Sequence, residues 1–497
     1  MSRRKGGSSF GLGGYGEALP AAGGLLLIGF VMLTVALLMD RLALDAISGF
    51  ITLLLLVVAS IPAITWLARR EDDPGLAGIL TWGLAFTVGG TVARYFVVTV
   101  IYGDNADAGV YSDAAAEMVR LIKAGVFTLV PPGLESRPPE SQRIAVVLAA
   151  VYVLVGVSRW AGTFVFAWLA FGGRILLWRA LKRAVPEADQ HRYLLLVLFF
   201  PSLVFWPSSI GKEALMTFSI GLVSYGAAQL FSERVSLGSV FTFGAGVVAL
   251  LFVRPHMAAI AVAALGLASV VSTLGSLKRG SQMKATLLRA GALVLLVGIA
   301  VVVFTQTSQF LGDEDAGTST SVNTGEATGV EGVLESTKAQ TSIGGSVFAA
   351  PSVNSPIDLP WATVTVLFRP FPWEASSGTG FIAALEGLGL LVLFTASWRR
   401  VASGFVMMLR RPYLVFVGVF AVVFITAFSF IGNFGILTRQ RTQLLPLAFV
   451  FLAMPRMTRG RGLFAPTDEV LEPEDEGIDP QPDESSEHLG ADPSVSA

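Results

Sequence analysis

Apolar residues are gathered in long runs that short polar junctions separate along most of the 497-residue chain. Several runs reach the roughly 20 residues that a helix needs to cross a bilayer. They show no alternation of apolar and polar positions, so they predict helices rather than the strands of a barrel. The runs lie at about 21–39, 46–67, 76–101, 144–182, 192–208, 213–232, 238–253, 256–275, 286–306, 380–398, 412–431 and 442–455. This pattern predicts an all-α fold, a multi-pass transmembrane helical bundle of about 12 helices with external loops and an interfacial helix.

Lysine and arginine residues mark alternate junctions between the runs. Loops with an excess of these residues stay on the cytoplasmic side of a membrane. The N-terminal leader, residues 1–20, carries "SRRK" and is therefore placed inside. The other basic junctions then also fall inside, at 68–70, 181–192, 232–234, 276–280, 397–412 and 455–461. We expect both termini to be cytoplasmic and three longer segments to lie outside, at 102–143, 307–379 and 432–441.

The run at 144–182 is too long for one helix. A hairpin of two crossings there would reverse every later segment and break the charge rule. We therefore expect one crossing preceded by an interfacial or re-entrant helix.

Composition supports the membrane assignment and narrows the chemistry. Charged residues make up 14% of the chain, against about 25% in soluble proteins. The absence of cysteine excludes disulfides, thiolate catalysis and cysteine-ligated zinc. Three histidines leave little material for a multi-histidine metal site.

The charge of the chain is unevenly distributed. The segment 467–497 holds eleven acidic residues and no lysine or arginine, so 25 acidic residues face 35 basic ones in the rest of the chain. The residues from 457 onward are predicted to form a disordered cytoplasmic tail, either a solvated end or a regulatory arm. The membrane domain then spans residues 21–456.

Two carboxylates stand directly outside the third predicted helix, in "IYGDNADAGVYSD". Asp104 and Asp107 are followed by Tyr111 and by an amphipathic stretch that predicts a helix on the membrane surface, with Ser112 or Asp113 as its N-cap. A carboxylate held at the outer face suits a general base for a sugar hydroxyl or a ligand for a divalent cation. The alternative is that the two aspartates only cap a turn.

Basic residues also occur at junctions predicted to lie outside, where the charge rule disfavours them. Such a cluster at the lipid interface suits a lipid phosphate or diphosphate, which arginine binds through two N–H groups and lysine as a point charge. The alternatives are nonspecific headgroup contacts, outward snorkelling of Arg94, and a local ion pair between the adjacent Lys212 and Glu213. The candidate substrate-binding residues are Arg94, Tyr111, Lys212, Glu213, Arg254, His256, Arg369, Arg439 and Arg441.

The order of these features resembles that of GT-C glycosyltransferases, multi-pass enzymes that take sugars from polyprenyl-phosphate carriers. "DAGVY" at 107–111 is similar to the first external loop of that superfamily, in which an aspartate is the proposed catalytic base. The resemblance implies Asp107 in this role, with Asp104 as the second candidate, and it makes 21–456 a GT-C-like catalytic domain. The motifs "WPSSIGKEAL", "VRPH", "FRPFPWEA" and "GNFGILTRQR" also resemble uncharacterised membrane proteins of bacterial exopolysaccharide loci.

The resemblance implies a glycosyltransferase in the bacterial cytoplasmic membrane. It would move a sugar from a polyprenyl-phosphate carrier to a glycan or lipid-linked acceptor at the outer face. Its expected partners are these two substrates and membrane lipids, not nucleic acid, and a divalent cation is the one cofactor left open. The alternatives are an O-antigen-type polysaccharide polymerase or ligase, for which "TRQR" and the external segment at 307–379 are suited, and a lipid-linked glycan transporter.

Overall fold

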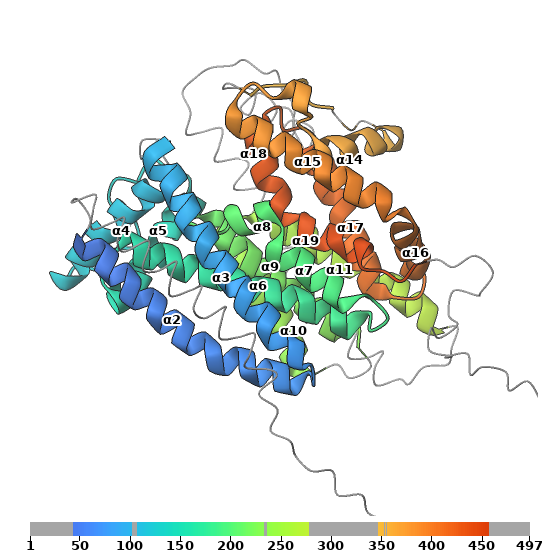
Figure 1. The fold of residues 1–497 in the computed structure, drawn as a ribbon, viewed down its shortest axis with the longest axis horizontal. Helices are drawn as coiled ribbons and strands as arrows, with labels where there is room; N and C mark the ends of the chain where they lie inside the picture. Colours follow the sequence, from blue (N-terminus) through green and yellow to red (C-terminus); the bar gives the residue numbers. More distant parts are fainter. Residues whose placement is uncertain are drawn as a thin grey trace, which may run out of the picture. The chain divides into compact units, whose positions relative to one another are not determined.

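The computed structural model describes residues 43–101, 107–232, 236–277, 346–351, 353 and 355–456. Within these ranges the regular secondary structure is helical, apart from one isolated β-bridge between Val347 and Asn433 (Figure 1). The leader, the runs at 21–39 and 286–306, most of the segment 307–379 and the acidic tail lie outside the described residues, as does Asp104. The longer helices are α2 (Ala43–Arg70), α3 (Pro74–Phe96, continued by the π-helical turn Val97–Ile101), α4 (Asp107–Lys123), α5 (Pro139–Val155), α6 (Arg159–Ala184), α9 (Lys212–Leu230), α10 (Leu237–Val253), α11 (Pro255–Leu277), α15 (Gly378–Ala396) and α17 (Pro412–Phe428). The shorter ones are α7 (Gln190–Phe199), α8 (Pro201–Phe205), α14 (Leu359–Phe368), α16 (Trp398–Met408), α18 (Phe434–Gln440) and α19 (Leu445–Leu452).

Five of the described helices are long and apolar enough to cross a membrane, and a sixth is added if α16 and α17 count as one bent span. They lie at Asp45–Arg70, Gly75–Val100, Arg159–Ala184, Pro255–Ser272 and Gly378–Ala396. The prediction of an all-helical chain is confirmed for the described residues. The count of about 12 crossings stays a prediction.

Breaks inside the predicted runs explain why some of these runs do not form one long helix. The apolar run at 192–208 is divided at Phe200, whose extended backbone separates α7 from α8. Pro201 has no N–H to continue the helical ladder and disfavours the helical conformation of the residue before it. The run at 144–182 is likewise divided, at Gly156 with its φ of 87°. Its second part, α6, is one of the candidate spans, whereas α5 has only 17 residues.

Helix α6 lies at the centre of the packing and contacts α9 at glycines. A side chain on Gly173 of α6 would place its Cβ 2.5 Å from the Thr217 carbonyl oxygen and 2.6 Å from the Phe218 Cα of α9. A side chain on Gly221 of α9 would come 2.4 Å from the Gly173 carbonyl oxygen. The two backbones therefore touch directly, as small residues allow in packed membrane helices.

Gly173→Ala is expected to lower the free energy of unfolding by about 1–3 kcal/mol, because the added methyl group meets backbone that cannot rotate away. Gly172→Ala is the matched control, since no atom lies within 4 Å of the Cβ that it would add. This control is expected to raise stability by up to about 1 kcal/mol through helix propensity. Unfolding of the detergent-solubilised protein measures both, and equal effects of the two variants would contradict the close contact.

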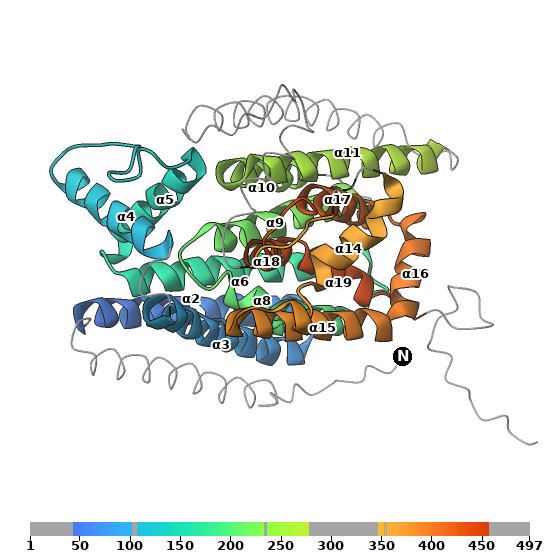
Figure 2. The same ribbon diagram turned by 90° about the horizontal axis from the view of Figure 1, so that it is seen from above.

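Helices α4 and α5 form a hairpin at one end of the long helices (Figure 2). Near the start of α5, Arg143 donates hydrogen bonds to the Leu251 and Phe252 carbonyls, at the end of α10. At the other end of α5, the Ser48 hydroxyl of α2 donates to the Val155 carbonyl. Helix α5 thus reaches from the end of α10 to the start of α2.

The structure corrects two expectations about α4. The helix begins at Asp107, not at Ser112 or Asp113, and Asp107 suits this place because a negative side chain interacts favourably with a helix N-terminus. Its apolar face, including Met118 and Val119, is buried and packs on α5 rather than being free to lie on lipid. The Ser112 and Tyr152 hydroxyls, 2.8 Å apart, join the two helices.

Candidate functional site

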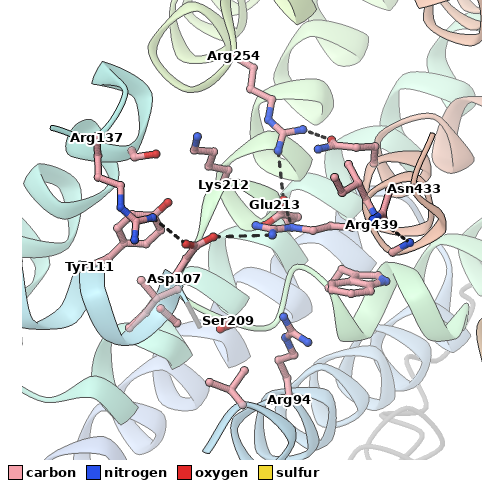
Figure 3. A pocket seen from close by; sticks show the side chains of 18 residues that line it. Arg94, Asp107, Tyr111, Arg137, Ser209, Lys212, Glu213, Arg254, Asn433 and Arg439 are labelled. Atoms are coloured by element: carbon pink, nitrogen blue, oxygen red, sulfur yellow. Dashed lines mark hydrogen bonds and ion pairs between the residues drawn. The ribbon is translucent and has the colours of Figure 1, made fainter. Parts of the chain in front are cut away.

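A cavity of about 540 Å³ opens where the ends of several helices meet (Figure 3). Its walls come from α3, α4, the start of α5, the turn before α9, the α10–α11 junction and α18. Seven charged side chains line it: Arg94, Asp107, Arg137, Lys212, Glu213, Arg254 and Arg439. Six of these seven are residues that the sequence predicted, from five separate segments of the chain.

The cavity lies far from the basic junction at 68–70, which the sequence placed in the cytoplasm. Arg94 is 20 residues along α3 from Pro74, or roughly 30 Å at 1.5 Å per residue. A turn of three residues joins Pro74 to Arg70, which ends α2. The basic junction and the cavity therefore lie toward opposite ends of α3.

Glu213 is the centre of the charge network. Only 5% of its surface is exposed. Arg439 binds both of its carboxylate oxygens, with Nε 2.7 Å from Oε1 and Nη2 2.9 Å from Oε2. Arg254 Nη2 lies 3.4 Å from Oε1, and its Nη1 donates to the Gln440 side-chain oxygen. One buried carboxylate thus fixes Arg439 of α18 and Arg254 of the α10–α11 junction.

Lys212 does not pair with its neighbour. Its Nζ lies 3.3 Å from Oε1 of Glu140, on α5. The interpretation of Lys212 and Glu213 as a local ion pair is therefore wrong. Successive residues at the start of a helix point in different directions, so each finds a partner on another element.

Asp107 occupies the opposite wall, at the first turn of α4. Arg137 Nη1 lies 3.2 Å from its Oδ1, and Arg439 Nη1 lies 3.9 Å from its Oδ2. Arg439 therefore stands between the two carboxylates of the cavity. The Asp107 side chain remains 44% exposed, so it is accessible to a molecule in the cavity.

Arg94 and Tyr111 complete the predicted residues that line the cavity. The Arg94 guanidinium lies 4.7 Å from the centre of the Trp206 ring and 4.9 Å from that of Phe205, in the range of cation–π contacts. Burial raises the pKa of the Tyr111 phenol above its ordinary value of 10, so the phenol is protonated at neutral pH and can donate a hydrogen bond. Arg94 thus lines the cavity together with other cations. This position differs from that of an arginine that only extends outward to the lipid headgroups.

Three predicted ligands are not among the residues that line the cavity. His256 stands near the Phe428 ring, with 6.0 Å between ring centres. Arg369 binds Glu374 and lies 4.7 Å from the centre of the Phe348 ring. Arg441 is 1% exposed and bonds to Glu386 at 3.2 Å and to two backbone carbonyls of the segment 367–369. His256 and Arg441 thus contact other helices, and Arg369 pairs with a carboxylate five residues along the chain, so none of the three is part of the proposed site.

The sequence reasoning missed several polar residues that the structure brings to the cavity: Arg137, Ser141, Asn433 and Gln440. A signal existed for Arg137, because it is a basic residue in a segment predicted to lie outside, as Arg254 is. Ser141, Asn433 and Gln440 carry no charge, so the charge rule could not single them out. Uncharged polar residues are common in loops and at helix ends, as Asn433 shows by capping α18 through its Oδ1.

The charges of the cavity favour an anion over a metal. Five basic side chains line it against two acidic ones. Within the described ranges, no three His, Asp or Glu side chains are grouped so that they could hold a metal ion. The carboxylates of Asp107 and Glu213 both face arginines. The possibility of a divalent cation at Asp104 lies outside the described residues.

Comparison of the chain with protein-family models, with curated proteins and with solved structures found no match.

Proposed function

We propose that this protein is a membrane glycosyltransferase. It moves a sugar from a polyprenyl-phosphate carrier to a glycan or lipid-linked acceptor at the outer face of the bacterial cytoplasmic membrane. The observation that carries this proposal is that one cavity holds an accessible carboxylate, Asp107, together with five cations. A base for the acceptor and a binding site for the leaving phosphate are the two parts that the reaction needs.

The excess of cations supports binding of a phosphate. Arg254 and Arg439 are oriented by Glu213, and an arginine so fixed loses little freedom when its other N–H groups bind an anion. Lys212 adds a point charge from the start of α9. Cations fixed before the reaction stabilise the negative charge that develops on the departing phosphate.

The step is a single displacement at the anomeric carbon. Asp107 takes the proton of the acceptor hydroxyl, whose oxygen forms the new bond to the anomeric carbon. The bond from that carbon to the carrier phosphate breaks, and the phosphate leaves with the electron pair. The sugar is therefore transferred with inversion of configuration.

The position of the cavity supports action at the outer face. It lies toward the ends of the helices that are remote from Arg69 and Arg70. The charge rule places Arg69 and Arg70 in the cytoplasm, and this puts the cavity at the level of the outer headgroups, where the phosphate of a lipid carrier is found.

Reconstitution of the purified protein in liposomes tests the proposal. A polyprenyl-phosphate sugar carrying a radioactive label is offered with a lipid-linked glycan acceptor, and labelled product is separated from the donor. Transfer that requires the protein is the expected result. Movement of the labelled donor between leaflets with its sugar–phosphate bond intact would instead identify a transporter and overturn the proposal.

An O-antigen-type polymerase or ligase is the second candidate. Arg439, the first arginine of "TRQR", enters the cavity, and five cations exceed what one phosphate needs. A diphosphate-linked oligosaccharide offered in the same liposomes separates the two enzymes. Its use as donor, with no transfer from the monophosphate carrier, would favour this second function.

A further inference from the structure

The loop that joins α4 to α5 presents an apolar surface at its tip. Phe127 is 82% exposed and Leu129 is 81% exposed, and the neighbouring Val126 and Val130 are also exposed. The segment 124–134, "AGVFTLVPPGL", contains no charged residue. Exposing four neighbouring apolar side chains to water is unfavourable. Exposed apolar clusters of this kind mark interaction sites.

The conformation of the loop is fixed by its own hydrogen bonds. The Val126 N–H donates to the Leu121 carbonyl at 2.9 Å, and Gly125, with a φ of 81°, turns the chain out of α4. The Thr128 hydroxyl accepts from the Val130 N–H at 3.1 Å. Leu134, in the segment that leads back toward α5, is completely buried and packs in the core. The tip therefore projects outward although the base of the loop is anchored.

The surroundings of the loop indicate lipid as the partner. The hairpin is attached to the end of α10 through Arg143. Helix α10 is itself apolar and, toward the end that Arg143 contacts, exposes Val248 and Phe252. The hairpin that carries the loop is thus joined to an apolar helix whose adjoining end also exposes apolar side chains. Exposed Lys123 directly before the loop suits the phosphate of a lipid headgroup.

We propose that the tip of this loop, Val126–Val130, inserts into the membrane leaflet on the cavity side and anchors the α4–α5 hairpin there. Apolar residues on such an interfacial element lie roughly 5–10 Å below the headgroup boundary. Helix α4, which precedes the loop, begins at Asp107, and Arg137 lies at the end of the loop just before α5. Both residues line the cavity. Insertion would therefore set the height of two cavity walls relative to the headgroups. This inference does not depend on glycosyl transfer.

The absence of cysteine allows a direct test, because a single introduced thiol can be labelled in the natural background. Phe127→Cys and Leu129→Cys are each labelled with an environment-sensitive fluorophore. The full-length protein is then reconstituted in liposomes of phosphatidylcholine and phosphatidylglycerol. Asp113→Cys, at an exposed position of α4 that does not line the cavity, is the matched control.

We expect blue-shifted emission from positions 127 and 129 and strong quenching by lipids that carry a nitroxide on the upper acyl chain. Quenching by iodide, present on both sides of the membrane, should be several-fold weaker than at position 113. Equal iodide quenching at positions 127 and 113 would overturn the proposal. Protection from iodide without nitroxide quenching would also overturn it, since a protein partner or a second copy would then cover the loop.

Discussion

Asp107→Asn is expected to lower the rate of glycosyl transfer about 10²- to 10⁴-fold, the range that a general base contributes. The amide keeps the shape of the side chain but cannot take the proton of the acceptor hydroxyl. Because Arg137 and Arg439 remain in place, binding of the lipid-linked donor should be retained. The comparison of kcat with the donor Kd in the liposome assay measures both effects.

Two results bear on this assignment. Asp113→Asn, an exposed position on the same helix, is the control and should leave the rate unchanged. Full activity of Asp107→Asn would remove Asp107 from the role of base. Asp104 would then be the first candidate to examine, as the second carboxylate of the same external segment.

Glu213→Ala is expected to lower the free energy of unfolding by about 3–5 kcal/mol, because it leaves the buried Arg254 without its carboxylate and removes one of the two carboxylates that Arg439 faces. Arg439 and Arg254 both bind this carboxylate, and it is among the most buried acidic groups of the described chain. Denaturation in mixed micelles, followed by tryptophan fluorescence, measures the loss. Donor affinity should fall as well, since the two arginines lose the group that orients them.

The exposed pair of Glu117 and Arg120 supplies the control for this prediction. Removing Glu117 should change stability little, since an exposed pair gains little from its attraction. If Glu213→Ala does not fold, the conservative Glu213→Gln together with Arg439→Gln removes the charge pair from both sides. This double variant should be less damaged than the sum of its two single variants. Additive effects would contradict the coupling of Glu213 to Arg439.

The sequence was informative where a residue departs from a simple rule. Arg254 and Arg439 break the charge rule at junctions predicted to lie outside, and both line the cavity. Lys212 and Glu213 lie at the junction of two apolar runs, and both also line the cavity. The same reasoning selected Arg369 and Arg441, which bind elsewhere in the structure. A charged residue where the charge rule disfavours it therefore indicates a residue that has a specific partner. The rule does not identify that partner.

Helix boundaries followed local chemistry where that chemistry was strong. Pro201 divides one predicted run because proline cannot continue the helical hydrogen-bond ladder, and Gly156 divides another because glycine readily adopts the positive φ at that position. The start of α4 was misplaced, because Ser112 offers an N-cap that the chain does not use. Its hydroxyl is bonded instead to Tyr152 on α5, a contact that no local pattern reveals.

By itself, the sequence determined that the described part of the chain is helical, that several segments suit a membrane, and which charged residues lie near the ends of apolar runs. These properties follow from the cost of placing polar groups in lipid, which each segment incurs on its own. Only the tertiary structure decided that Glu213 binds Arg439, 226 residues away, that Lys212 turns to Glu140, and that Arg137 faces Asp107. The physical reason is that depth in a membrane is set along one helix, whereas the direction of a side chain and its partner are set by the packing of several.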